Sequence, residues 1–113
     1  DWYMAATHSN GILVIQNNKI INRFDDANSP LKRQAPLNLI KISGMAEDAK
    51  GNLWIGSFGS DVPLMCYTKA GQWKTFDIGT SEVRDITIDN QGRKWMILQT
   101  GGILVFDEGK NMD

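Results

Sequence analysis

Two aspartates, Asp48 and Asp89, occupy the same place in two copies of one short motif, and their carboxylates are the first candidates for chemistry. In each copy, Asp is followed three residues later by Gly and six residues later by Trp: Asp48–Gly51–Trp54 and Asp89–Gly92–Trp95. Ca²⁺ binds to some Asp-x-x-Gly loops, but it requires about six to eight oxygen ligands, and each motif supplies a single carboxylate. In the alternative interpretation each motif is a hairpin turn, in which Asp accepts backbone N–H groups and Gly adopts a positive φ. We therefore predict no metal site and structural turns at Asp48, Gly51, Asp89 and Gly92.

The other reactive side chains do not form a catalytic set. His8 is the only histidine and lies in turn residues, without the orienting carboxylate of a general base or the further His and Cys ligands of a zinc site. Cys66 is the only cysteine, and its apolar neighbours favour a buried packing residue over a reactive thiol. Phosphate-binding glycine loops and nucleophile elbows are absent from the sequence. The sequence predicts a chain without enzymatic activity, catalytic residues or a cofactor.

The charge of the chain argues against polyanionic partners. Twelve basic and thirteen acidic residues leave a formal net charge of −1, and the two signs are interspersed. We therefore expect neither nucleic acid nor an anionic membrane as a partner. Because no stretch approaches the roughly 18 apolar residues that span a bilayer, we also expect no membrane insertion of this segment.

Short apolar segments between turn residues predict an all-β fold around the two motifs. The middle of the chain reads as a four-strand meander, with its first strand over 39–46 interrupted at Gly44. Trp54 and Trp95 are 41 residues apart, the period of four-stranded propeller blades. We predict one partial β-propeller domain over 1–113, with about two and a half four-stranded antiparallel blades. The blade pieces are expected at about 1–24, 39–78 and 83–107, with an irregular connection at 25–38.

Three of the four tryptophans, Trp2, Trp54 and Trp95, precede equivalent apolar strands by eight to ten residues. Exposed tryptophans form platforms for sugars, whereas a tryptophan that recurs with the repeat packs one blade against the next. Burial of one such side chain stabilises the fold by up to about 4–6 kcal/mol. We predict blade packing for all three.

The sequence around the first motif resembles a known repeat. Met45-Ala-Glu-Asp-Ala-Lys-Gly-Asn-Leu-Trp-Ile-Gly-Ser57, with Asn28-Ser-Pro-Leu31 upstream, is similar to the two-component-regulator propeller repeat. In the third copy Arg93-Lys-Trp-Met-Ile-Leu98 replaces the usual Asn-Leu-Trp-Ile-Gly-Thr. In the first copy Ala5-Ala-Thr7 and Asn10-Gly-Ile-Leu-Val14 fit the pattern, while the turn is missing.

The resemblance implies a segment of a larger extracytoplasmic β-propeller, periplasmic or at the cell surface. Such propellers form the sensor regions of hybrid histidine kinases, often in Bacteroidetes that respond to glycans. Similar repeats occur in surface proteins linked to type IX secretion, and Gly101-Gly-Ile-Leu-Val-Phe-Asp107 in the third copy looks closer to that group. Propeller lyases share such repeats and use a metal and histidine; His8 alone leaves this a remote alternative.

Loops that depart from the repeat are the expected contact surface for a glycan or protein ligand, because the strands are committed to packing. The candidate contact residues lie in the 25–38 connection and in the loop that follows the middle tryptophan: Lys32, Arg33, Phe58 and Asp61.

The outer faces of the first and third blades are expected to be apolar and to lack neighbours within the chain. Exposed apolar faces and unpaired strand edges favour self-association, so we expect this segment to form a homo-oligomer, most simply a dimer. In the alternative, the 25–38 connection folds over one face and caps it.

Overall fold

The computed structural model describes residues 2–6, 11–34 and 39–107, and every regular element in these ranges is a β-strand. The strands follow the chain in this order: β1 (Trp2–Ala6), β2 (Ile12–Gln16), β3 (Lys19–Phe24), β4 (Arg33–Gln34), β5 (Leu39–Ile40), β6 (Ile42–Glu47), β7 (Leu53–Ser57), β8 (Leu64–Tyr67), β9 (Trp73–Phe76), β10 (Val83–Ile88), β11 (Lys94–Leu98) and β12 (Ile103–Phe106). Within these ranges there is no helix of the length and apolarity needed to cross a membrane.

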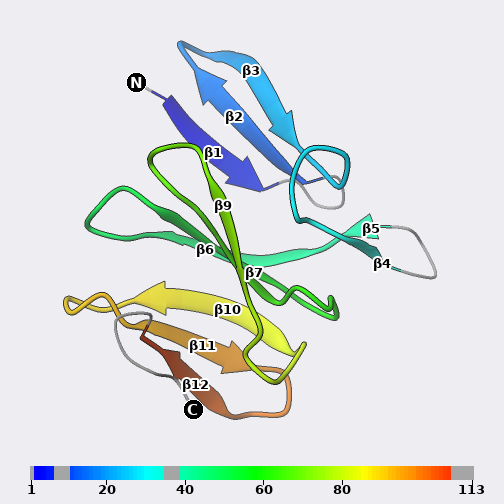
Figure 1. Ribbon diagram of the computed structural model, residues 1–113, viewed down its shortest axis with the longest axis vertical. Helices are drawn as coiled ribbons and strands as arrows, with labels where there is room; N and C mark the ends of the chain where they lie inside the picture. The colour runs from blue at the N-terminus through cyan, green and yellow to red at the C-terminus, as the bar shows by residue number, and fades with distance from the viewer. Residues whose placement is uncertain (1, 7–10, 35–38, 108–113) are drawn as a thin grey trace.

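Three antiparallel meanders make up most of the fold. The first sheet has the order β1-β2-β3, the middle sheet β6-β7-β8-β9 and the third sheet β10-β11-β12. Figure 1 shows the first and third sheets at opposite ends of the molecule, with the middle sheet between them. Sheets of three, four and three strands confirm the predicted all-β fold of about two and a half antiparallel blades.

The two predicted motifs form the hairpin turns of the middle and third sheets. The Gly51 N–H donates to the Asp48 carbonyl at 3.1 Å, and the Gly92 N–H donates to the Asp89 carbonyl at the same distance. Gly51 has φ +87° and Gly92 has φ +80°, a region that side chains disfavour. The same backbone geometry therefore reverses the chain in both copies.

The strand that begins the middle blade differs from its prediction. It breaks at Lys41, between β5 and β6; at Gly44 the strand continues, although its pairing with β7 shifts in register between Ile42 and Gly44. The Lys41 carbonyl accepts the Ser57 hydroxyl at 2.7 Å, and β5 turns away to pair with β4 inside the expected irregular connection. Gly44 lies within β6, where a Cβ would come within 3.0 Å of the Ile86 backbone nitrogen of β10. The glycine thus marks a close approach of two sheets, which sequence alone cannot distinguish from a break.

Strand alternation sends side chains of the middle sheet into two separate cores. On β7, Ile55 is buried against the first sheet and Trp54 against the third. The buried residues of the first core are Ile12, Val14, Phe24, Leu31, Ile40, Ile55 and Met65. Those of the second core are Trp54, Leu64, Cys66, Val83, Ile86, Met96 and Phe106. The middle sheet is therefore covered on both faces within this chain.

The register predicted for the first tryptophan is wrong by two residues. When the first and middle sheets are aligned on Phe24 and Phe76, which pair with the first residues of β2 and β8, Met4 falls at the place of Trp54. Trp2 lies two residues before that place. The connection from β1 to β2 is two residues shorter than that from β7 to β8, counted between the paired residues at its ends. Although Trp2 and Trp54 precede their next apolar strands by the same number of residues, they do not occupy equivalent positions in the two sheets.

Because Trp54 and Trp95 differ in burial, we predict that they contribute unequally to the free energy of unfolding. We expect Trp54→Ala to lower the free energy of unfolding by about 3–5 kcal/mol, because the ring is fully buried and leaves a cavity. Trp95→Ala should cost clearly less, since that side chain is 38% exposed. Urea unfolding of both variants at low protein concentration measures the difference. Equal losses would contradict the assignment of Trp54 to the core between the middle and third sheets.

Candidate functional site

The Asp48 motif is a single hydrogen-bonded unit. Asp48 Oδ1 accepts the backbone N–H groups of Lys50 and Asn52, each at 2.9 Å. Oδ2 accepts the Asn52 side-chain amide at 3.1 Å and the Trp54 indole Nε1–H at 3.0 Å. The turn carboxylate therefore also orients the tryptophan that packs into the next sheet. The indole bond was not anticipated from the sequence, although the constant six-residue spacing of Asp and Trp was its signal.

The Asp89 motif repeats this arrangement with a different side chain. Asp89 Oδ1 accepts the backbone N–H groups of Gln91 and Arg93, at 2.9 and 3.0 Å. Oδ2 accepts the Trp95 indole at 2.8 Å and Arg93 Nε at 2.7 Å. Arg93 thus occupies the position of Asn52 and turns the amide contact into an ion pair.

Hydrogen bonding keeps both carboxyl groups ionised. For Asp89, the bond from the Trp95 indole is the main cause of a strongly lowered pKa; burial opposes it, and Arg93 adds to it. For Asp48, burial is the largest effect and raises the pKa, but the bonds from Trp54, Asn52 and Lys50 together outweigh it. In both motifs each carboxylate oxygen already accepts two donors. This arrangement is that of a structural turn.

Trp54 lies between aromatic rings and a buried ammonium group. It stacks on Phe76 with ring centroids 5.3 Å apart and contacts Phe106 of the third sheet at 6.0 Å. Lys94 Nζ lies 4.0 Å from the centroid of the Trp54 ring, in a side chain that is only 3% exposed. A desolvated cation over tryptophan contributes about 2 kcal/mol. This contact therefore stabilises the packing of the third sheet on the middle sheet.

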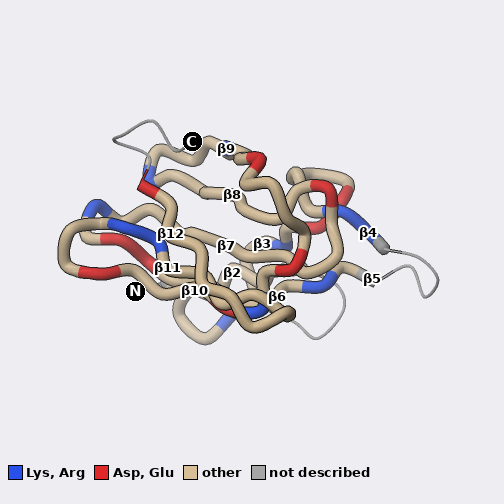
Figure 2. The backbone as a smooth tube through the Cα atoms, turned by 90° about the horizontal axis from the view of Figure 1, so that it is seen from below, with Lys and Arg blue, Asp and Glu red and all other residues tan. Residues whose placement is uncertain are grey.

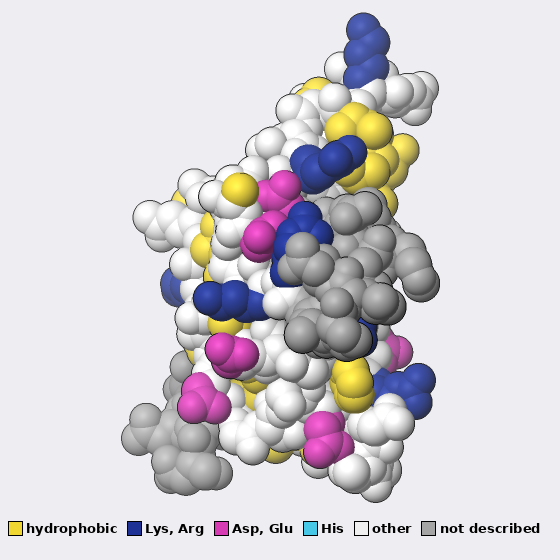
Figure 3. Space-filling model, turned by 90° about the vertical axis from the view of Figure 1, so that its right-hand side faces the viewer, with side chains coloured by type: hydrophobic (Ala, Val, Ile, Leu, Met, Phe, Trp, Pro, Cys, Tyr) yellow, Lys and Arg dark blue, Asp and Glu magenta, His cyan; other side chains and the backbone are white. Residues whose placement is uncertain are grey.

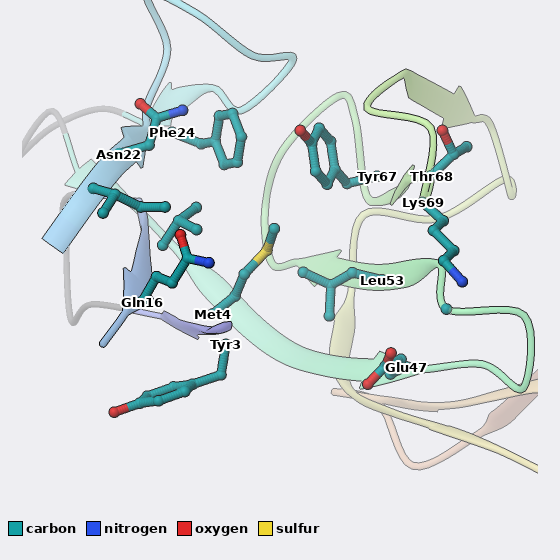
Figure 4. A pocket seen from close by; sticks show the side chains of 13 residues that line it. Tyr3, Met4, Gln16, Asn22, Phe24, Glu47, Leu53, Tyr67, Thr68 and Lys69 are labelled. Atoms are coloured by element: carbon teal, nitrogen blue, oxygen red, sulfur yellow. The ribbon is translucent and has the colours of Figure 1, made fainter. Parts of the chain in front are cut away.

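A cleft of about 740 Å³ opens between the first and middle sheets, next to the Asp48 turn. Figure 4 shows Tyr67, Thr68 and Lys69 on the middle-sheet side, opposite Phe24 and Asn22 of the first sheet. The ring centroids of Phe24 and Tyr67 are 4.9 Å apart, and these two rings lie at the floor of the cleft. Apolar and polar side chains converge on this hollow, and we take it as the candidate site.

The walls of the cleft combine an apolar floor with a polar rim. The apolar residues are Met4, Val14, Ile21, Phe24 and Leu53. The residues with polar groups are Tyr3, Gln16, Asn22, Glu47, Tyr67, Thr68 and Lys69, with Gly51 completing the lining. Amide, hydroxyl, carboxylate and ammonium groups supply both donors and acceptors beside an aromatic surface. An apolar surface with a few polar groups around it is typical of sites for small polar ligands.

The contact residues predicted from the sequence lie elsewhere. Lys32, Arg33, Phe58 and Asp61 do not line the cleft. Lys32 and Asp61 are exposed, while Arg33 Nε pairs with Asp26 Oδ1 at 2.8 Å. Phe58 is half-buried in a loop held to Ser81 by the Gly59 N–H. The cleft could not be predicted from the sequence because its residues come from six strands of two sheets, β1, β2, β3, β6, β7 and β8, and from the turns beside them.

Cys66, a further candidate for chemistry, does not line the cleft. Cys66 is buried in the core between the middle and third sheets. His8 lies outside the described residues, and so does the side chain of Trp2. Among the residues that the structure describes, no three His, Cys, Asp or Glu side chains are grouped closely enough to hold a metal ion.

The comparison with protein families matches residues 36–59, the segment that holds β6, the Asp48 turn and β7, to the two-component regulator propeller family. The chain carries a two-component regulator propeller repeat. Its three meanders are accordingly blades of a β-propeller, and the middle sheet is the blade that contains the repeat. A comparison with well-characterised proteins gave no significant sequence match.

Two solved structures share this arrangement of propeller blades. One is PorZ, described as an essential bacterial surface component of the type-IX secretion system of Porphyromonas gingivalis: TM-score 0.80, 22% identity and 93% of this chain covered. The other is the extracellular domain of the putative hybrid two component system BT3049 from B. thetaiotaomicron: TM-score 0.65, 23% identity and the whole chain covered. The chain spans 16% of the length of each. At these identities the likeness shows the fold.

The lowered carboxyl pKa values predict an acid-dependent loss of stability. A carboxyl group whose pKa is lower in the folded state stabilises the fold above its unfolded pKa, here 3.8, and this stabilisation disappears as the pH falls further. We expect urea midpoints that are level near neutral pH and fall below about pH 4. In the Asp48→Asn/Asp89→Asn variant the midpoint should be lower at pH 7 and fall less steeply in acid.

Asp61→Asn, in an exposed loop, is the matched control and should follow the wild-type curve. Parallel acid curves for the wild type and the double variant would show that the motif carboxylates do not carry the effect.

Proposed function

We propose that this chain is a non-enzymatic, ligand-binding segment of a larger extracytoplasmic β-propeller in the sensor region of a two-component regulator. The observation that carries the proposal is the match of residues 36–59 to the two-component regulator propeller family. The likeness to the extracellular domain of a putative hybrid two component system supports the location outside the cytoplasm. The remaining blades of the propeller are the first expected partner, because the chain spans 16% of that structure.

The cleft between the first and middle sheets is the proposed binding site. A glycan suits it best, because sugar rings offer an apolar face to Phe24 and Tyr67 and hydroxyl groups to Asn22, Glu47 and Lys69. A protein ligand is the second candidate, since a peptide also pairs apolar and polar groups. Figure 2 shows acidic and basic residues interspersed along the chain, which does not favour nucleic acid or an anionic membrane.

A role in a surface-associated secretion protein is the alternative. The specific observation in its favour is the TM-score of 0.80 to PorZ, against 0.65 to the hybrid two component system. In that case the segment contacts a protein partner, and the loops with Phe58 and Asp61 and with Lys32 and Arg33 are the expected contact surface. The face in Figure 3, which shows the side of the molecule with β4 and β5, carries charged groups of both signs.

Ligand titration by NMR distinguishes these roles. We expect neutral oligosaccharides to shift the backbone signals of cleft residues, with affinity reduced at least about tenfold in Asn22→Ala and Glu47→Gln. Thr75→Ala, at an exposed position of strand β9, is the matched control and should bind as the wild type. Prolonged incubation should release no cleaved sugar, because binding here involves no covalent step.

Shifts confined to the loops of Phe58 and Lys32 on addition of peptides would favour the alternative role. Release of a cleaved product would contradict the non-enzymatic assignment. Loss of binding in the control together with the cleft variants would show that the cleft is not the binding site.

A further inference from the structure

The hairpin turn between β8 and β9, residues 68–72, supplies part of the cleft wall through Thr68 and Lys69. The Gly71 N–H donates to the Thr68 carbonyl at 2.9 Å, so this turn has the same backbone bond as the Asp48 turn. The Thr68 hydroxyl accepts one backbone N–H, at 3.0 Å, whereas the Asp48 carboxylate accepts four donors. The β8–β9 turn therefore has less side-chain support of its own.

Asn52 bridges the two turns through both groups of its side-chain amide. Its Nδ2 donates to Asp48 Oδ2 at 3.1 Å, and its Oδ1 accepts the Lys69 backbone N–H at 3.0 Å. Because the carboxylate only accepts, it fixes the orientation of the amide and leaves the amide oxygen toward Lys69. Asn52 itself is not among the residues that line the cleft. One side chain thus connects the Asp48 carboxylate to a residue of the cleft rim.

The side chain of Lys69 also lies against the Asp48 turn. A Cβ at Gly51 would lie 3.1 Å from Lys69 Cδ, so the methylene stem of the lysine packs beside the glycine. Figure 4 shows this side chain extending from the end of β8 along the middle-sheet side of the cleft. The backbone and the stem of Lys69 are therefore held at two separate points, which limits the positions that its ammonium group can take.

We propose that Asn52 is a positioning residue for the cleft: its amide holds the β8–β9 turn, and with it Lys69, in the geometry that a bound ligand meets. Its effect on affinity rests on the proposed function of the cleft, because an ordered rim loses less conformational entropy when a ligand binds. The third sheet provides the comparison. There Arg93 stands at the place of Asn52 and bonds to Asp89, but a guanidinium group has no acceptor for a backbone N–H.

Asn52→Arg separates the two bonds of the amide, since it keeps a donor for Asp48 and removes the acceptor for Lys69. We expect the Lys69 amide to exchange its hydrogen at least about tenfold faster in this variant, as for the loss of one hydrogen bond. The Gly51 amide, bonded within the Asp48 turn, is the internal control and should keep its rate within about threefold.

Hydrogen exchange measured by NMR gives both rates without any ligand. An unchanged Lys69 rate in Asn52→Arg would overturn the proposal. Equally faster exchange at Lys69 and Gly51 would show that the substitution loosens both turns together, and this too would contradict a specific hold on Lys69. Thermal melting verifies that each variant is folded.

The affinity of the cleft for neutral oligosaccharides tests the consequence for binding. Asn52→Arg and Lys69→Met should each bind at least about threefold more weakly than the wild type, and the double variant about as weakly as Lys69→Met alone, because both changes act on one group. Lys74→Met, at an exposed position of β9 opposite Cys66, removes a lysine outside the cleft and should bind as the wild type.

Effects of Asn52→Arg and Lys69→Met that simply add in the free energy of binding would show that Asn52 does not act through Lys69, and would overturn the proposal. A wild type that binds no oligosaccharide would contradict the proposed function of the cleft. In that case the exchange rate of the Lys69 amide still decides whether Asn52 holds the β8–β9 turn.

Discussion

The indole of Trp54 joins a hairpin turn to the neighbouring blade, and the rest of the structure depends on this connection. Its N–H donates to Asp48, which also accepts the backbone of the turn. Its ring stacks on Phe76 and is covered by the ammonium group of Lys94. Turn geometry and blade packing are thereby coupled, because the residue that orders the turn also orients the side chain that fills the space between sheets.

The environment of each repeat depends on its neighbours as much as on its own sequence. Trp54 and Trp95 have the same bond to a turn carboxylate, yet one is fully buried and the other is partly exposed. Between the first and middle sheets Met4 takes the tryptophan position, and the cleft opens where this smaller side chain lies. One deviation from the repeat thus coincides with the candidate site.

The strands, hairpin turns and fold class were predictable because they follow from local signals: apolar runs, the positive φ of Gly51 and Gly92, and a constant repeat spacing. The cleft was not, because its walls come from strands and turns that only the packing of two sheets brings together. The burial of Lys94 was equally hidden, since a lysine that follows an arginine reads as a solvated pair. The offset of Trp2 came from a shorter connection, which changes register without changing the apolar pattern.

A double-mutant cycle on Asp48 and Trp54 tests most directly whether the turn and the blade packing are coupled. The free energy of unfolding is measured for the wild type, Asp48→Ala, Trp54→Phe and the double variant, with Trp54→Phe keeping an aromatic ring while removing the indole N–H. The account predicts a coupling energy of about 0.5–3 kcal/mol, as for residues that share one hydrogen-bond network. Single-variant effects that add to within about 0.3 kcal/mol would show that the carboxylate and the indole act independently, which contradicts the account.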